Sequence, residues 1–323
     1  MSGTALIIGV TGQDGAYLAR HLLTLGYAVH GTSRDAEAHD KSNLRRLGLL
    51  DRLRLHSVAP TDFRSVMQCI GSVRPDEIYN LSGQSSVGLS FDQPGETLES
   101  IANGTLNVLE AVRLSGLPAR IYNACSGECF GDVGGEAADE ATAFRPLSPY
   151  ATAKAAAFWL LANYRQAYGL HASSGILFNH ESPLRPERFV TRKIVAAAVR
   201  IANGSTERLK LGNTAIRRDW GWAPDYVEAM HLMLQQPRPR DFVIATGEAH
   251  SLGEFVAAVF ATVGLEWRKH VVIDQTLFRR AEIMANVGNA GAARATLGWE
   301  AKVRLPELAE RLVAAERDWQ AAK

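Results

Sequence analysis

The fold is decided at the amino terminus, where the chain reads Thr4-Ala5-Leu6-Ile7-Ile8-Gly9 and continues as Val10-Thr11-Gly12-Gln13-Asp14-Gly15. The apolar run is typical of a buried parallel strand, and the amphipathic stretch 17–23 predicts a helix after the glycines. A strand, a glycine-rich turn and a helix together form the setting of a dinucleotide-binding loop. Glycines let the backbone approach a pyrophosphate, and the helix N-terminus favours its charge.

The spacing of these glycines, Gly-x-x-Gly-x-x-Gly, is one residue off the commoner Gly-x-Gly-x-x-Gly. An ordinary βα turn is therefore the alternative, but the flanking strand and helix favour the cofactor loop. We expect the loop to bind a dinucleotide through Gly9, Thr11, Gly12, Gln13, Asp14 and Gly15.

The end of the second expected strand, 28–31, indicates which dinucleotide is bound. NAD enzymes place a carboxylate there for the ribose 2′-hydroxyl. This chain has Thr32-Ser33-Arg34, with Asp35 one step later. An arginine with hydroxyls suits a 2′-phosphate through charge-assisted hydrogen bonds. The sequence therefore favours NADP over NAD, with Arg34 as a ligand.

Strands and helices then alternate along the chain. Apolar runs at 53–56, 77–81, 121–124 and 175–179 predict strands, and 62–71 and 97–114 predict helices. This alternation predicts an α/β fold with a Rossmann-type, doubly wound parallel sheet. Its strand carboxyl ends share one rim, where Ser85, Ser126 and Glu128 would gather beside the cofactor.

The later part of the chain predicts a division into two regions. Residues 1–179, joined by 225–247 through a strand at 242–246, are expected to form the NADP-binding domain. Residues 180–224 and 248–323 are expected to form a smaller, mostly helical C-terminal lobe that binds the substrate. Basic side chains recur there at loop or helix ends, as a phosphate-bearing substrate requires, although solvated surface residues are the alternative for each one. They are Arg185, Lys193, Arg218 and Arg279.

Tyr150 and Lys154 provide the first indication of catalysis. Four residues apart on a helix, they project from one face. A cation beside a phenol lowers its pKa, which would make Tyr150 a base towards a sugar or alcohol hydroxyl. The spacing alone is weak, because an exposed helical pair with no chemistry looks the same. The glycine-rich loop is what strengthens the catalytic interpretation.

Composition excludes several other functions. The chain has 323 residues, is 46% hydrophobic and carries a net charge of +1, so nothing favours nucleic acid or a membrane surface as a partner. Three cysteines are too few for a disulfide framework and lack metal-binding partners, so no metal is expected and Cys125 and Cys129 are interpreted as small, half-buried residues. Because there is no membrane-length apolar run and no signal peptide, we expect a soluble, cytoplasmic protein.

Taken together, the motifs resemble those of the extended short-chain dehydrogenase/reductases, and specifically of the GDP-mannose 4,6-dehydratases. The stretch Gln84–Phe91 and the run Glu128–Gly131 also resemble relatives that act on GDP-linked heptose. The matching stretches cover nearly the whole chain. They are 9–15, 79–81, Ser126-Gly127-Glu128, 148–154, Phe178-Asn179-His180-Glu181-Ser182-Pro183, Phe189-Val190-Thr191-Arg192-Lys193, Arg218-Asp219-Trp220-Gly221 and Leu297-Gly298-Trp299.

The resemblance implies a redox-neutral dehydration of GDP-mannose to GDP-4-keto-6-deoxymannose with tightly bound NADP. Tyr150 would take the proton of the sugar 4-hydroxyl while hydride passes to NADP. Glu128 would remove the proton at carbon 5, water would leave carbon 6 with help from Glu128 and Ser126, and hydride would return to carbon 6. The family also suggests a homotetramer or homodimer, in which the loop from Asp35 to Arg46 reaches a neighbour's cofactor.

The resemblance also assigns residues. Ser126, Glu128, Tyr150 and Lys154 would be catalytic. Further cofactor contacts would come from Leu81, Ser85, Tyr150, Lys154, His180 and Arg185. The GDP-sugar would be bound by Ser85, Asn179, Val190, Lys193, Gly212, Arg218, Arg279 and Glu282.

Three alternatives stay open: the same reaction on GDP-D-glycero-D-manno-heptose, a nucleotide-sugar epimerase or reductase of this fold, and a cofactor-binding regulator. A regulator would be expected to lose Tyr150 or Lys154, and an epimerase needs no carboxylate at position 128, although Glu128 could also be a surface glutamate. Departures from the family pattern bear mainly on sugar identity and on the catalytic loop, which Gly127 is expected to loosen. They are Ala59, Gly127, Arg145, Leu147, Arg280 and Met284.

Overall fold

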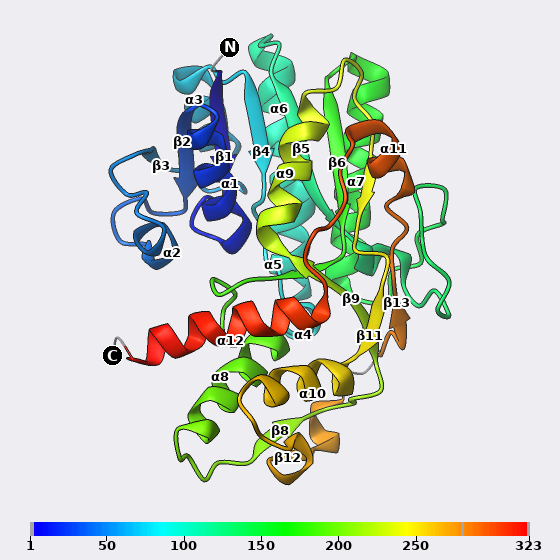
Figure 1. Cartoon of the computed structure of the whole chain (residues 1–323). Coiled ribbons are helices and arrows are strands. Elements are labelled where there is room, and N and C mark those ends of the chain that lie inside the picture. The colour runs from blue at the N-terminus through cyan, green and yellow to red at the C-terminus, as the bar shows by residue number, and fades with distance from the viewer. Residues whose placement is uncertain (1–2, 279–280, 322–323) are drawn as a thin grey trace.

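The computed structural model describes residues 3–278 and 281–321 and has a parallel sheet covered by helices on both faces (Figure 1). The sheet has seven strands in the order β10-β6-β5-β4-β1-β2-β3, and every neighbouring pair is parallel. The predicted doubly wound Rossmann-type fold is confirmed. The strands are β1 Thr4–Ile8, β2 Ala28–Ser33, β3 Arg54–Ser57, β4 Glu77–Asn80, β5 Arg120–Ser126, β6 Ala172–Leu177 and β10 Phe242–Ile244.

Two apolar layers hold the helices on the sheet. On one face Leu22, Met230 and Trp299 belong to a fully buried cluster, and on the other Ile70, Val112 and Leu161 do the same. Helices α1 Gln13–Thr24, α9 Ala223–Leu234 and α11 Gly291–Leu297 cover the first face; α3 Phe63–Val73, α6 Gly104–Ser115 and α7 Pro149–Tyr168 cover the second. Short helices α2 Ser42–Arg46, α4 Val87–Asp92 and α5 Pro94–Leu98 lie in the connections.

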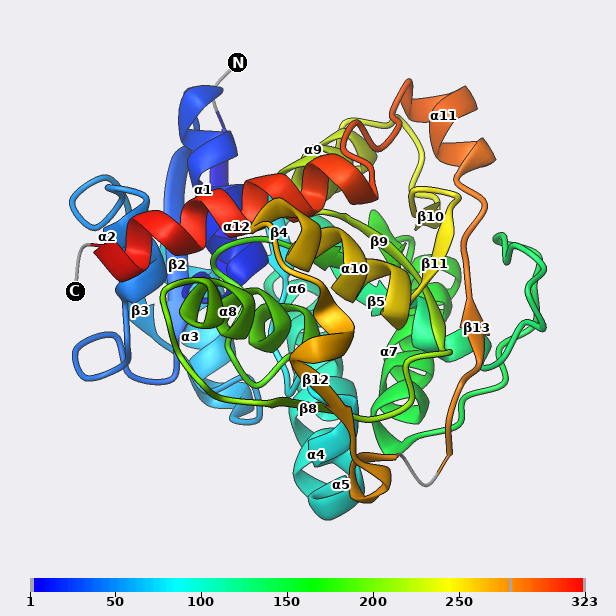
Figure 2. The same cartoon turned by 60° about the horizontal axis from the view of Figure 1, so that its bottom comes forward.

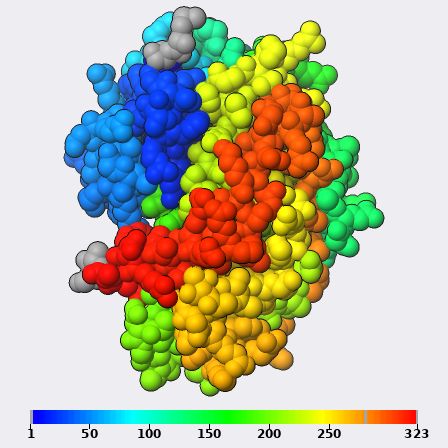
Figure 3. Space-filling view, in the orientation of Figure 1, coloured from blue at the N-terminus to red at the C-terminus, as the bar shows by residue number. Residues whose placement is uncertain are grey.

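A smaller lobe lies below the strand carboxyl ends and has its own core. Helices α8 Val190–Ala202, α10 Leu252–Thr262 and α12 Leu305–Ala321 pack around Val199, Phe255 and Leu312. Helix α12 crosses between this lobe and the amino-terminal part of the molecule (Figure 3). The short strands here are β7 Asn179–Glu181, β8 Leu209–Leu211, β9 Arg217–Trp222, β11 Ala249–Ser251, β12 Val271–Ile273 and β13 Ala285–Asn286.

The structure differs from the sequence expectations in three places. The strand expected at 175–179 ends at Leu177, and Asn179 begins β7, which pairs with β9 instead of the main sheet. The helix expected at 97–114 is interrupted by a π-helix at Glu99–Asn103. This irregular turn brings Gly104 so close to Pro60 that an added Cβ would lie 3.3 Å from the proline Cβ. Within the segment expected in the lobe, Ala293 and Trp299 pack in the core of the main sheet.

None of the helices within the described residues is both long enough and apolar enough to cross a membrane.

Candidate active site

The turn after β1 has the backbone geometry that a pyrophosphate requires. Gly9 has φ +91°, and a Cβ added to Gly15 would lie 2.4 Å from the Gly9 carbonyl oxygen, so both positions need glycine. Gly12 caps α1 without a side-chain hydrogen bond, which leaves the first-turn amides open to an anion. These residues fit a dinucleotide cofactor.

A buried network fixes this turn to the chain after β6. The Asp14 carboxylate lies 2.9 Å from His180 Nε2, and Gln13 accepts a hydrogen bond of 2.8 Å from the Ser182 hydroxyl. Burial opposes both charges, but the attraction between the two groups outweighs it. The pKa of Asp14 is lowered to about 2, and that of His180 is raised. His180 therefore stabilises the cofactor turn through Asp14.

A cavity of about 350 Å³ opens beside the strand carboxyl ends and collects most of the predicted site. Three described substrate candidates, Lys193, Gly212 and Glu282, do not line it. The Lys193 ammonium donates instead to the Lys210 carbonyl at 2.8 Å. Glu282 lies outside its wall but pairs with Arg218 at 3.8 Å. Arg279 and Arg280 lie outside the described residues. The predicted residues that line the cavity are Asp14, Leu81, Ser85, Ser126, Glu128, Tyr150, Lys154, Asn179, His180, Arg185, Val190 and Arg218.

The four predicted catalytic residues come from three adjoining elements. Ser126 ends β5, and its hydroxyl accepts the Glu128 amide at 3.3 Å, which starts a 3-10 turn at Gly127–Phe130. Tyr150 and Lys154 lie in the first turns of α7, whose start is fixed by the Ser148 cap. The strand end, the 3-10 turn and the helix thus bring a hydroxyl, a carboxylate, a phenol and an ammonium to one cavity.

The expectation that Lys154 lowers the pKa of Tyr150 is wrong for the chain by itself. Burial raises the pKa of the phenol, a hydrogen bond with Ser126 partly opposes the rise, and the Glu128 charge adds to it. The Lys154 ammonium lies 5.9 Å from the centre of the Tyr150 ring and donates to the Ala124 carbonyl at 2.7 Å, and burial lowers its own pKa. In the chain by itself, burial therefore favours the neutral phenol of Tyr150.

The two cysteines beside this site are packing residues. Cys125 and Cys129 are 3% and 0% exposed, so they are fully buried rather than half-buried, and their sulfur atoms lie 3.7 Å apart. Burial raises the pKa of Cys129, which keeps it a neutral thiol. Among residues 3–278 and 281–321, no three His, Cys, Asp or Glu side chains are grouped to hold a metal.

Gly127 leaves room for an aromatic ring beside the catalytic turn. A Cβ at position 127 would lie 3.0 Å from Phe178 Cζ. The Phe178 ring also stacks on the Phe130 ring, with 6.1 Å between the ring centres. The glycine therefore admits an aromatic ring against the backbone of the turn. Sequence reasoning also missed Asn286, which lines the cavity and donates to the Gly127 carbonyl at 3.0 Å. No motif surrounds Asn286 that could have singled it out.

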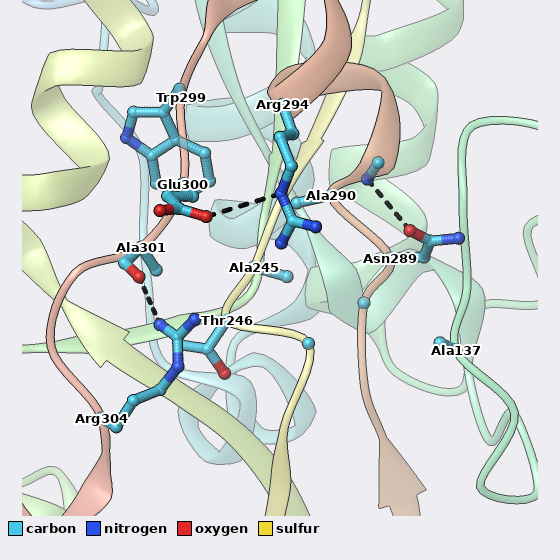
Figure 4. Close-up of a pocket in the computed structure, with 13 residues that line it drawn as sticks. Ala137, Ala245, Thr246, Asn289, Ala290, Arg294, Trp299, Glu300, Ala301 and Arg304 are labelled. Atoms are coloured by element: carbon cyan, nitrogen blue, oxygen red, sulfur yellow. Dashed lines mark hydrogen bonds and ion pairs between the residues drawn. The ribbon is translucent and has the colours of Figure 1, made fainter.

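A second cavity of about 160 Å³ lies between the end of β10 and α11 (Figure 4). Its two arginines are already paired. Arg294 lies 3.5 Å from Glu300, and Arg304 contacts Glu248 at 3.0 Å and the Ala301 carbonyl. We assign it no role.

Known proteins are similar to this chain over nearly its whole length. GDP-mannose 4,6 dehydratase 2 of Arabidopsis thaliana is 45% identical over 329 residues, covering 99% of this chain and 87% of the relative. The structure of Thermus thermophilus UDP-glucose 4-epimerase with NAD has a TM-score of 0.86 at 26% identity and covers 97% of this chain and 99% of its own. A dTDP-glucose 4,6-dehydratase from Streptomyces venezuelae has a TM-score of 0.87 at 22% identity, covers 99% of this chain and 98% of its own, and shows the fold alone.

The family-level match covers the glycine turn, the catalytic turn, the Tyr150 helix and most of the lobe. The model of the GDP-mannose 4,6 dehydratase family matches residues 6–312. On this match and on the identity to its curated members, the chain belongs to the GDP-mannose 4,6-dehydratase family.

Proposed function

We propose that this protein is a hydro-lyase that converts GDP-mannose to GDP-4-keto-6-deoxymannose without net oxidation, using NADP. The observation that carries the proposal is the presence of Glu128 and Tyr150 in one cavity, together with Ser126 and Lys154. A ketoreductase or epimerase needs the tyrosine and the lysine, whereas elimination also needs a carboxylate to remove the proton beside a ketone.

Each of these residues would have a distinct role in the reaction. Tyr150 accepts the proton of the sugar 4-hydroxyl, and the Ser126 hydroxyl favours the charged form of the phenol by lowering its pKa. Glu128 removes the proton at carbon 5 and returns a proton to the departing 6-hydroxyl. Lys154, held by the Ala124 carbonyl, supplies positive charge near the phenol. When bound, the oxidised nicotinamide supplies the hydride acceptor and a further positive charge.

The proposed preference for NADP rests on the end of β2. Arg34 is exposed there, while the neighbouring Asp35 carboxylate accepts the Glu37 and Ala38 amides at 2.8 and 2.9 Å. The carboxylate is thus held by its own loop, and the arginine can meet a 2′-phosphate. Titration should show that NADP binds more tightly than NAD and that Arg34→Ala removes the difference. Equal affinities in the wild-type protein would refute the preference.

We also propose that the segment from Asp35 to Arg46, which is exposed at residues 37–40, reaches a second copy of the chain, in a homotetramer or homodimer. Light scattering at working concentration should report a multiple of 35.1 kDa, and a monomer would contradict this assembly.

Incubation with GDP-mannose and, separately, with GDP-D-glycero-D-manno-heptose tests the function. Mass spectrometry should detect a product lighter by one water from GDP-mannose. A lighter product from the heptose alone would reassign the substrate. A product of unchanged mass would favour the epimerase, since the epimerase similarity is the main competing indication.

A further inference from the structure

One side chain from the carboxyl-terminal part of the chain holds the turn that carries Glu128. Asn286, in β13, is 2% exposed. Its Nδ2 atom donates to the Gly127 carbonyl at 3.0 Å and lies 3.4 Å from the Gly131 carbonyl. These two carbonyls stand at either end of the turn, so a single amide group spans it.

The turn needs such a restraint because it begins at Gly127, directly before Glu128, and is followed by Gly131. Gly127 offers no side chain to anchor, and Gly131 has φ +72°. Glycine allows more backbone conformations than any other residue. A buried carbonyl that loses its donor costs free energy, so the Asn286 amide disfavours conformations in which the turn tilts out of place.

The chain around Asn286 runs beside the segment that follows the turn. The Asp132 carboxylate accepts the amides of Met284 at 3.0 Å and Ala285 at 3.4 Å. Further along, the Ala138 amide donates to the Val287 carbonyl at 2.9 Å. Figure 2 shows β13 passing in front of this loop. We call residues 282–289 the strap.

The strap is also attached to the predicted substrate side of the cavity. The Arg217 amide donates to the Met284 carbonyl at 2.8 Å, and the Arg218 guanidinium donates to the Ile283 carbonyl at 2.8 Å. Arg218 lines the cavity and pairs with Glu282. One continuous segment therefore links an arginine of the substrate cavity to the backbone of the catalytic turn.

We propose that Asn286 is a positioning residue that sets the place of Glu128 for the elimination half of the reaction. This inference rests on the proposed dehydratase function. Tyr150 and Lys154 belong to α7, whose start is capped separately by Ser148. Loss of the Asn286 amide should therefore slow proton removal at carbon 5 and leave the first oxidation intact.

Two substitutions remove the donor in different ways. Asn286→Leu replaces the amide with an apolar group, and Asn286→Asp keeps its shape but points oxygen at the two carbonyls. A misplacement of about 1 Å can cost about 10²-fold in rate, so we expect kcat to fall about 10- to 100-fold. KM should stay within about threefold, since only transition-state interactions are lost. Reduced nicotinamide should accumulate during turnover.

Asn289→Leu is the matched control, because it removes an asparagine amide from the same strap. The Asn289 side chain accepts the Gly291 amide at 2.9 Å, beside the second cavity (Figure 4). This variant should keep the wild-type kcat. An equal loss in Asn289→Leu and Asn286→Leu would mean that the strap is merely structural and would overturn the proposal.

A double-mutant cycle separates positioning from general damage. If Asn286 acts through Glu128, then adding Asn286→Leu to Glu128→Gln should change the residual kcat by less than about twofold. If the double variant instead loses kcat by the product of the two single-variant factors, the inference would be overturned.

The remaining outcomes are also decisive. If Asn286→Leu does not fold, Asn286→Asp and Asp132→Ala, at an exposed residue, replace it. Asp132→Ala should also lower kcat with little change in KM, but by a smaller factor than Asn286→Leu. Wild-type kcat in both would overturn the positioning role. If the wild-type protein itself releases no dehydrated product from either GDP-sugar, the proposed function fails first, and the inference fails with it.

Discussion

Tyr150 and Glu128 reach the same cavity from different elements. Tyr150 belongs to the first turn of α7, and Glu128 to the 3-10 turn after β5. The two proton transfers of the proposed reaction therefore depend on separate supports. A substitution can impair one transfer and spare the other.

Glu128→Gln and Tyr150→Phe should fail at different steps. Glu128→Gln keeps its shape but loses its base, so product formation should fall by about 10²–10⁴ while GDP-sugar still binds and reduced nicotinamide still appears. Tyr150→Phe should show neither reduction nor product. Stopped-flow absorbance with product analysis measures both, and exposed Glu136→Gln is the control. If Glu128→Gln turned over at the wild-type rate, the epimerase or reductase would become the better account.

The Asp14–His180 pair predicts a pH dependence of stability. The Asp14 pKa is lowered from 3.8 to about 2. The stability that the Asp14 carboxylate contributes to the fold is therefore fully present above pH 3.8 and is lost as the pH falls through about 2. The His180 pKa is raised above 6.5. The stability that the His180 imidazolium contributes to the fold is therefore fully present below pH 6.5 and is lost as the pH rises through the raised pKa.

Thermal unfolding of the cofactor-free protein tests this. The difference in Tm between the wild type and Asp14→Asn should be largest between about pH 4 and 6.5 and should shrink above that range. The fall in the Asp14 pKa corresponds to about 2 kcal/mol. Exposed His39→Gln should leave the pH profile unchanged. A Tm difference that does not vary with pH would contradict the ion pair.

At the scale of elements, Phe178 joins the strand ends to the catalytic turn. Its ring lies against Gly127 on one side, and a Cβ on Gly288 would lie 2.6 Å from its Cε2 atom. The ring also stacks on Phe130. Because the ring is confined, it cannot easily yield to a larger neighbour.

Gly127→Ala should therefore destabilise the protein. The added methyl group would lie 3.0 Å from Phe178 Cζ, and such overpacking typically costs about 1–3 kcal/mol. Gly71→Ala in α3 is the matched control, because nothing lies within 4 Å of its added Cβ and it should stabilise by about 0.5–1 kcal/mol. Urea denaturation measures both. Equal or greater stability in Gly127→Ala would contradict the packing.

The sequence predicted the elements whose signal is local. Strand β1, the Gly9–Gly15 turn and the α7 pair follow from periodicity and spacing, and the strand carboxyl ends then meet by topology. The contacts of Asn286 and Phe178 could not be predicted in this way, because they join segments about 50 residues apart or more without a repeating pattern. Cytoplasmic location and the lack of nucleic-acid partners stay predictions.

At the scale of the whole molecule, α12 ties the lobe to the cofactor side. Its Glu316 pairs with Arg192 of α8, with both side chains at most 5% exposed. Near its end, the Arg46 guanidinium of α2 lies 3.2 Å from the centre of the Trp319 ring. Asn43 of α2 in turn donates to the Thr11 carbonyl at 3.0 Å in the glycine turn.

Glu316→Ala should strongly destabilise the fold. It would leave the Arg192 charge buried without its carboxylate, which typically costs about 3–5 kcal/mol. Exposed Glu310→Ala, on the same helix, should change the free energy of unfolding by less than about 0.5 kcal/mol. Denaturant unfolding measures the free energy of unfolding of the two variants. Similar values for Glu316→Ala and Glu310→Ala would show that the Arg192–Glu316 pair does not stabilise the packing of α12.

The central claim is that one site oxidises carbon 4 and reduces carbon 6 of the same sugar. GDP-mannose carrying deuterium at carbon 4 tests it most directly, with the position of the label read from the product by NMR. We predict a 4-keto-6-deoxy product with the deuterium on carbon 6, because the hydride removed at one carbon is returned to the other. A product that retains deuterium at carbon 4, or that loses it to free reduced cofactor, would contradict the account.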